Sequence, residues 1–240
     1  MRLTTVERFL DFPSPDIGRG LLLRLGYRAG FGVVWQSTQR IYRNSNGGLH
    51  YAPLEQVDLD ERITLEVMEQ DEADGSFHVL YRHDPQRHRK GGQSITPPPP
   101  RLVYARETSV GEILECSASE TPTQILLPPW RITQGSTWRD VERMVPFRGS
   151  TTVEMVRLFR VTTVGHGFVG LASDSIPLTY PTDGEDAGPS EITLSERGEY
   201  VFDTRWGGVR RLEIDATVST REGSRRIEML VSRKLEVLDD

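Results

Sequence analysis

The sequence predicts a mainly β protein: a strongly curved antiparallel sheet, half-barrel or barrel-like, made of two similar halves with a short N-terminal helix. Three observations support this prediction: long stretches of alternating apolar and polar residues, glycine-containing turns between them, and a similar order of elements in both halves. Alternation with a period of two gives an antiparallel strand one dry face and one wet face.

The clearest alternation covers residues 198–238. Residues 199–206 place Tyr200, Phe202 and Trp206 on one side, and a Gly-Gly turn follows. Residues 209–220 and 227–237 then alternate apolar with charged or hydroxyl side chains, separated by a second turn. We expect three antiparallel strands here.

The longest alternation of the first half is at residues 21–35, with three glycines on the polar side. Glycines on one strand face permit strong bending or the close approach of another backbone, which suits a highly curved sheet. Residues 152–163 are apolar on both sides, which indicates a central strand. Further strands are expected at residues 63–67, 77–81, 102–104 and 110–114.

The N-terminal arm, residues 1–20, is expected to hold one or two helical turns. A threonine at position 4 or 5 can cap a helix whose apolar stripe is Val6, Phe9 and Leu10. Such a helix would either plug one end of the sheet or dock on a partner.

The two halves of the chain follow the same order. Residues 63–81 match residues 154–172 without a gap, and residues 102–111 are answered by residues 200–209. Two copies predict a pseudo-symmetric domain and not a solenoid. We therefore expect residues 21–240 to form a single all-β domain of two halves, about 21–120 and 130–238, on either side of a proline-containing connector.

Two motifs resemble those of a family of uncharacterised bacterial domains. One is Pro128-Pro129 followed by Gly135 and Trp138, and the other is the strand Tyr200-Val201-Phe202-Asp203 that ends at Gly207. More remotely, the organisation looks like the lipoprotein-carrier half-barrels of the LolA and LppX kind. This resemblance implies a curved antiparallel sheet closed by a short helix, a carrier role and export, and it brings no catalytic residues.

Charge and hydropathy limit the classes of partner that the sequence predicts. The net charge of −6 offers nucleic acid no attraction. No run reaches the apolar length of a membrane span, and the first residues lack the apolar core of an export signal, so we expect a cytoplasmic protein. Residues 55–74 are acidic and residues 82–90 are basic. The basic stretch is interpreted as a loop that neutralises the acidic one or meets an acidic partner.

No constellation for chemistry is visible. His78, His83 and His88 are five apart, which fits neither the helical nor the strand spacing of metal ligands. Cys116 lies in an alternating stretch and is interpreted as a half-buried strand residue. We expect no catalytic residue, metal or cofactor, and no enzyme.

The sequence therefore favours a non-catalytic binding or assembly module whose curved sheet engages another protein or a larger assembly. The alternative is a carrier of a hydrophobic small molecule or lipid in a half-barrel cavity. A dry strand face would look the same in both cases. The candidate partner- or ligand-binding residues are Tyr27, Phe31, Trp35, Phe202, Trp206 and Met229.

Overall fold

The computed structural model describes residues 8–11, 20–45, 55–118, 125–144, 153–182, 190–222 and 225–238. In this part of the chain every strand belongs to one antiparallel sheet, and there is no helix, so none that could cross a membrane. The strands are β1 (Arg8–Asp11), β2 (Gly32–Ser45), β3 (Glu55–Gln70), β4 (Phe77–Lys90), β5 (Gln93–Ile95), β6 (Arg101–Glu107), β7 (Ile113–Cys116), β8 (Thr137–Met144), β9 (Val153–Val164), β10 (Phe168–Ile176), β11 (Leu178–Thr182), β12 (Ser190–Asp203), β13 (Gly208–Glu222) and β14 (Arg225–Val237).

Twelve strands follow one path, in the order β1-β8-β9-β10-β12-β13-β14-β2-β3-β4-β6-β7, while β5 pairs with β4 and β11 with β12. Neighbours are mostly consecutive in the chain, as expected for antiparallel strands joined by short turns. The last strand in the chain, β14, pairs with β2. Strands from the C-terminal and N-terminal parts of the chain are therefore neighbours in the middle of the sheet. The terminal strands β1 and β7 do not pair with each other, so the sheet stays open.

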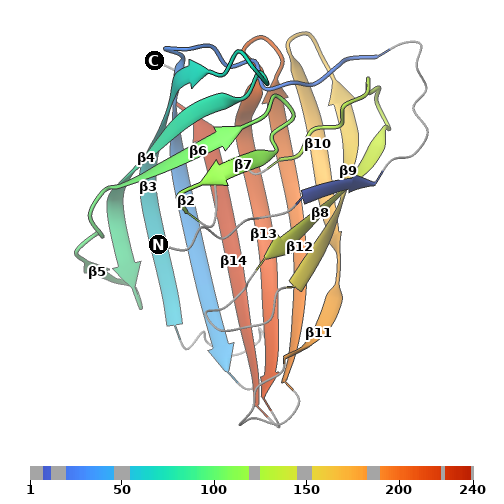
Figure 1. Cartoon of the computed structure of the whole chain (residues 1–240). Helices are drawn as coiled ribbons and strands as arrows, with labels where there is room; N and C mark the ends of the chain where they lie inside the picture. Colours follow the sequence, from blue (N-terminus) through green and yellow to red (C-terminus); the bar gives the residue numbers. More distant parts are fainter. Residues whose placement is uncertain are drawn as a thin grey trace.

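The sheet curves until its two ends lie over its middle. Figure 1 shows β6 and β7 on one side, and β8 and β1 on the other, in front of β12, β13 and β14. Register shifts at 60/61, 170/171 and 201/202 mark bulges or irregularities, and bulges increase local twist and bend. We call the enclosed side the inner face.

The main core lies on the upper part of the inner face. Trp138 stacks on Phe159 with ring centroids 5.2 Å apart, and Phe159 meets Tyr200 at 5.5 Å. The buried tryptophans also satisfy their polar atoms: Trp35 Nε1 donates to Val209 O, and Trp138 Nε1 donates to Leu126 O, both at 2.9 Å. Such partners let a large aromatic ring be buried without losing a hydrogen bond.

Residues 21–31 were expected to continue the strand that ends at Trp35, and this is wrong, because β2 begins at Gly32. The segment instead crosses the core, with Leu23, Leu25 and Tyr27 buried. Its first part bonds to segments outside the strands, where Gly26 N donates to Gly207 O at 3.0 Å, whereas Gly30 N and Phe31 O bond to Val67 of β3. Alternation of apolar and polar residues indicates an extended chain with one apolar side. It does not indicate whether a neighbouring strand pairs with that chain. The predicted close approach at glycine is confirmed, since a Cβ on Gly26 would lie 2.9 Å from Trp206 O.

The N-terminal arm shows a strand where a helix was expected. Arg8–Asp11 forms β1 and pairs with β8, with Phe9 opposite Val141. The rest of residues 1–19 lies outside the described residues, so the helix is not confirmed. A sheet edge offers unpaired backbone groups that an extended arm can use.

The basic stretch at residues 82–90 is not a loop but the second half of β4. Pro85 is accommodated where the pairing with β3 shifts register, a position that tolerates proline. The expected neutralisation is present: Arg87 pairs with Asp60, and Lys90 Nζ lies 2.7 Å from Glu55 Oε1.

The internal repeat stays a prediction. The gapless match of residues 63–81 with 154–172 aligns one hairpin with another, but it sets Phe77, 3% exposed, against Phe168, 44% exposed. A shift of one residue exchanges the two faces of a strand. A match that keeps the inner faces together therefore needs a one-residue offset.

Substitution of Gly207 tests how closely residues 21–31, which cross the core, pack on the sheet. Gly207 and Gly30 both have positive φ (70° and 77°), but a Cβ on Gly207 would lie 2.2 Å from Gly26 N, whereas a Cβ on Gly30 meets nothing within 4 Å. We expect Gly30→Ala to lower the free energy of unfolding by about 1 kcal/mol. Gly207→Ala should cost about 3 kcal/mol or more, because overpacking adds to the backbone strain. Urea denaturation of both variants measures the difference, and equal costs would contradict the close packing.

Candidate functional site

Five of the six candidate binding residues come together in or against the core. Tyr27, Trp35 and Phe202 are buried in it, and Phe31 and Trp206 are half-buried against it. Phe31 stacks on Trp206 with ring centroids 5.5 Å apart, and on Tyr27 at 6.0 Å. Their apolar surface is therefore largely taken up by one another.

Met229 lies apart from the other five, on the lower part of β14. In Figure 1 the long strands β12, β13, β14, β2 and β3 continue toward the lower end of the view, below β6, β7 and β8. On this extension an apolar row crosses four strands on the inner side, Val57, Ile41, Val231 and Ala216 by register; the row above it contains Gln39 and Arg233, and the row below it contains Arg43 and Glu55. We call the following residues the lower apolar face: Ile41, Val57, Leu59, Ala216, Val218, Met229 and Val231.

All seven residues of the lower apolar face are half-buried, in contrast to the buried core above them. Beside them on β12, Ile192 and Leu194 are buried against Val218 in a second, small cluster. Apolar side chains thus continue on the inner surface below the core and keep part of their exposure. Of the candidate binding residues chosen from the sequence, only Met229 belongs to this face. Alternation does not indicate at which residue of a strand the core ends.

A buried ion pair borders the lower apolar face. Arg157 Nη2 lies 2.8 Å from Asp140 Oδ2, and both side chains are nearly inaccessible (2% and 0% exposed). Arg157 Nη1 also lies 3.4 Å from Glu196 Oε1, and Glu196 pairs in register with Ala216. The guanidinium carbon is 5.9 Å from the Phe159 ring centroid. A desolvated arginine with two carboxylates and an aromatic ring is compensated, so this group positions strands and is not poised for chemistry.

A second polar group separates the core from the lower apolar face on the other side. Ser37 on β2 pairs in register with Glu61 on β3, and Glu61 Oε2 lies 3.3 Å from His83 Nδ1 on β4. All three side chains are buried. We call Ser37, Glu61 and His83 the polar shelf.

The charge state of the shelf follows from its neighbours. Burial opposes ionisation of Glu61, but the hydrogen bond and charge of His83, with the charges of Arg233 and Arg101, outweigh it and hold the pKa of Glu61 below its ordinary value. Glu61 is therefore ionised at neutral pH and accepts from His83. Sequence reasoning missed this group, since its members come from three strands and His83 was considered only for metal spacing.

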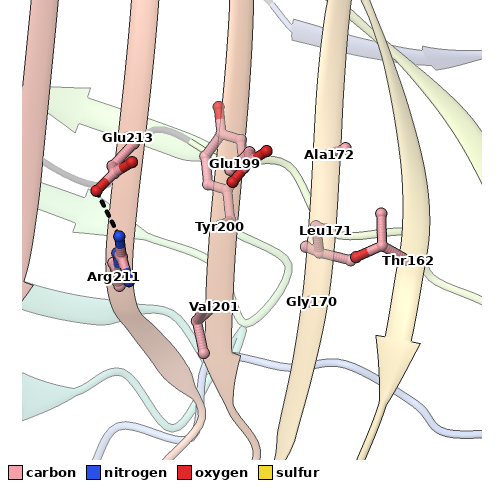
Figure 2. A pocket seen from close by; sticks show the side chains of 9 residues that line it. All are labelled: Thr162, Gly170, Leu171, Ala172, Glu199, Tyr200, Val201, Arg211 and Glu213. Atoms are coloured by element: carbon pink, nitrogen blue, oxygen red, sulfur yellow. Dashed lines mark hydrogen bonds and ion pairs between the residues drawn. The ribbon is translucent and has the colours of Figure 1, made fainter.

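The outer face carries a depression, shown in Figure 2, of about 310 Å³ over β9, β10, β12 and β13. Gly170 and Ala172 leave room there, and Arg211 Nη2 lies 2.6 Å from Glu213 Oε1 at the rim. The hydrogen bond and charge of Arg211 lower the pKa of Glu213, so this carboxylate has no proton to give at neutral pH.

The described residues offer little support for a metal site or a reactive thiol. Within the described ranges no three histidine, cysteine, aspartate or glutamate side chains are placed to hold a metal ion. Cys116 is half-buried in β7, as expected, and burial raises the pKa of its thiol, which makes the nucleophilic thiolate scarcer.

Comparison with known proteins adds no further guide: no family model matches the chain, and no curated protein matches it. The resemblance to bacterial half-barrels therefore stays a hypothesis, and function is argued from the inner and outer faces.

The role of Asp140 as a compensating charge can be tested against a matched exposed pair. Asp140→Ala should lower the free energy of unfolding by about 3 kcal/mol or more, because it removes a partner of the buried Arg157. The control is Asp174→Ala, which breaks an ion pair of 2.9 Å with Arg197 whose side chains are 60% and 81% exposed. That change should cost less than about 1 kcal/mol. Similar costs in urea denaturation would mean that Asp140 does not compensate a buried charge.

Proposed function

We propose that this protein is a non-catalytic binding protein that holds a hydrophobic small molecule on its lower apolar face. The observation that carries the proposal is the half-burial of seven apolar side chains on the inner side of an open, curved sheet. Contiguous apolar surface that the core does not use favours a binding site, and each CH₂ group moved onto it from water gains about 0.8 kcal/mol. The open sheet supports a half-barrel description.

The surroundings of the lower apolar face favour binding over catalysis. The Arg157 group is compensated by two carboxylates, and Glu61 is held ionised by His83. A general acid or base near neutral pH needs a carboxyl or imidazole released from such pairing. The face therefore offers apolar contact along its central row, with Gln39 and Arg233 in the row above and Arg43 and Glu55 in the row below.

Met229 provides the direct test. Met229→Glu should weaken binding of the neutral fluorescent probe N-phenyl-1-naphthylamine about tenfold or more, since it replaces apolar contact beside Val218 of the face by a charge. The control is Leu230→Glu, a half-buried neighbour whose side chain points to the opposite side of the same strand. Titration of probe fluorescence measures both. Equal affinities, or no probe binding to the unmodified protein, would reject the proposal.

A second candidate, engagement of a protein partner, rests on the outer face. Four large apolar side chains of the β9–β10 hairpin are exposed there, Leu158 and Val164 by 42%, Phe168 by 44% and Ile176 by 46%. The depression of Figure 2 lies on the same strands and has room for an inserted side chain. Apolar residues around a pocket favour a protein contact, because such anchors supply much of the binding energy.

This second candidate predicts that Leu158→Asp abolishes recovery of a partner that the unmodified protein retains in pull-downs. The control is Leu102→Asp, which alters an even more exposed leucine (64%) on β6 and should leave recovery unchanged. Crosslinking with mass spectrometry should place the partner on β9 and β10. Crosslinks confined to other strands, or equal loss in both variants, would exclude this surface.

A further inference from the structure

The central apolar row of the lower apolar face has different charges at its two ends. The row crosses four strands, from Val57 on β3 through Ile41 and Val231 to Ala216 on β13, and three strand spacings of about 4.8 Å make it about 14 Å long. Beyond Val57 the register continues to Lys90 on β4. Beyond Ala216 it continues to Glu196 on β12, where the Arg157 group has two carboxylates for one guanidinium. An amphiphile that lies along the row therefore meets a cation at one end only.

At the β4 end of the row two cations share one carboxylate. Lys90 Nζ lies 2.7 Å from Glu55 Oε1, and Arg43 Nη1 lies 3.9 Å from Glu55 Oε2. The hydrogen bond and charge of Lys90, with the charge of Arg43, hold the pKa of Glu55 below its ordinary value, so this carboxylate is ionised at neutral pH. Among the described side chains on the inner side of this end, one positive charge is therefore in excess.

The two cations lie at the rim of the face and keep much of their contact with water. The side chain of Lys90 is 59% exposed and that of Arg43 is 53% exposed. A charged head group beside them can stay hydrated while its alkyl chain lies on the apolar row, so binding does not require the burial of a charge. An anionic head group is attracted by the excess charge, and a cationic one is repelled.

We propose that the ligand of the lower apolar face is a single-chain amphiphile with an anionic head group, such as a carboxylate, which lies beside Lys90 and Arg43 while its chain follows the apolar row toward Ala216. The inference rests on the proposed function and adds the class of ligand. The row supplies apolar contact, and the excess positive charge at the β4 end selects the sign of the head group.

Two competitors of opposite charge test this selection. Decanoate and decyltrimethylammonium have alkyl chains of similar length, and each is titrated against N-phenyl-1-naphthylamine bound to the unmodified protein at low salt. Decanoate should displace the probe at about a tenfold lower concentration. The net charge of −6 would by itself favour the cation, so this preference requires a local positive site. The difference should shrink when NaCl is added, because exposed charges are screened.

Variants of adjacent residues locate the preference. Lys90→Gln should remove most of the advantage of decanoate, because it leaves Arg43 and Glu55 as a balanced pair. The control is Arg89→Gln, which removes the same charge from the preceding residue of β4, whose side chain points to the outer side of the sheet and pairs in register with Asp58. This control should keep the preference.

The outcomes separate the head-group site from the proposed function. A preference for decanoate that Arg89→Gln keeps and Lys90→Gln loses supports the site. Equal loss in both variants, or equal displacement by the two competitors, would overturn the head-group site alone, since the probe still binds. Absence of probe binding to the unmodified protein would overturn the proposed function with it.

Discussion

This structure depends on one constraint: a single sheet must bury its own apolar side. In the described residues there is no helix to pack against the strands, so burial is achieved by curvature and by extended segments laid across the inner face. Residues 21–31 and 125–132 fill the upper part, where the aromatic core lies. The longest strands extend beyond the part of the inner face that these two segments cover. The inner face below the core therefore keeps apolar side chains that are only half-buried, and this surplus is the physical origin of the candidate site.

The two buried polar groups lie where the inner face changes character. The charge of Arg157 is compensated by Asp140 and Glu196, and the energetic role of this group is to hold β8, β9 and β12 in place. The polar shelf joins β2, β3 and β4 through the pair of Glu61 and His83, while Ser37 Oγ and His83 Nε2 find no hydrogen-bond partner in the described residues.

Errors of sequence interpretation came from properties that local pattern does not carry. Residues 21–31 alternate like a strand because their apolar side packs on the core, although the backbone of residues 21–26 bonds to segments outside the strands. Residues 82–90 look like a basic loop, yet the acidic strand β3 neutralises them across the ladder. The aromatic candidates were chosen for size and parity, and large aromatic rings are also what a core takes up first. Met229 was chosen on the same grounds and lies outside the core, because β14 continues beyond it.

The sequence by itself determined the β class, the positions of many strands with their inward and outward sides, and the glycine turns, since all of these follow from local steric preferences and a two-residue period. Tertiary structure alone decided which strands neighbour one another and at what height. Ser37, Glu61 and His83 meet because β2, β3 and β4 align in one register, and Arg157 meets Asp140 and Glu196 through β8, β9 and β12. A period of two specifies a face but contains no information on register, which depends on pairing between residues far apart in the chain.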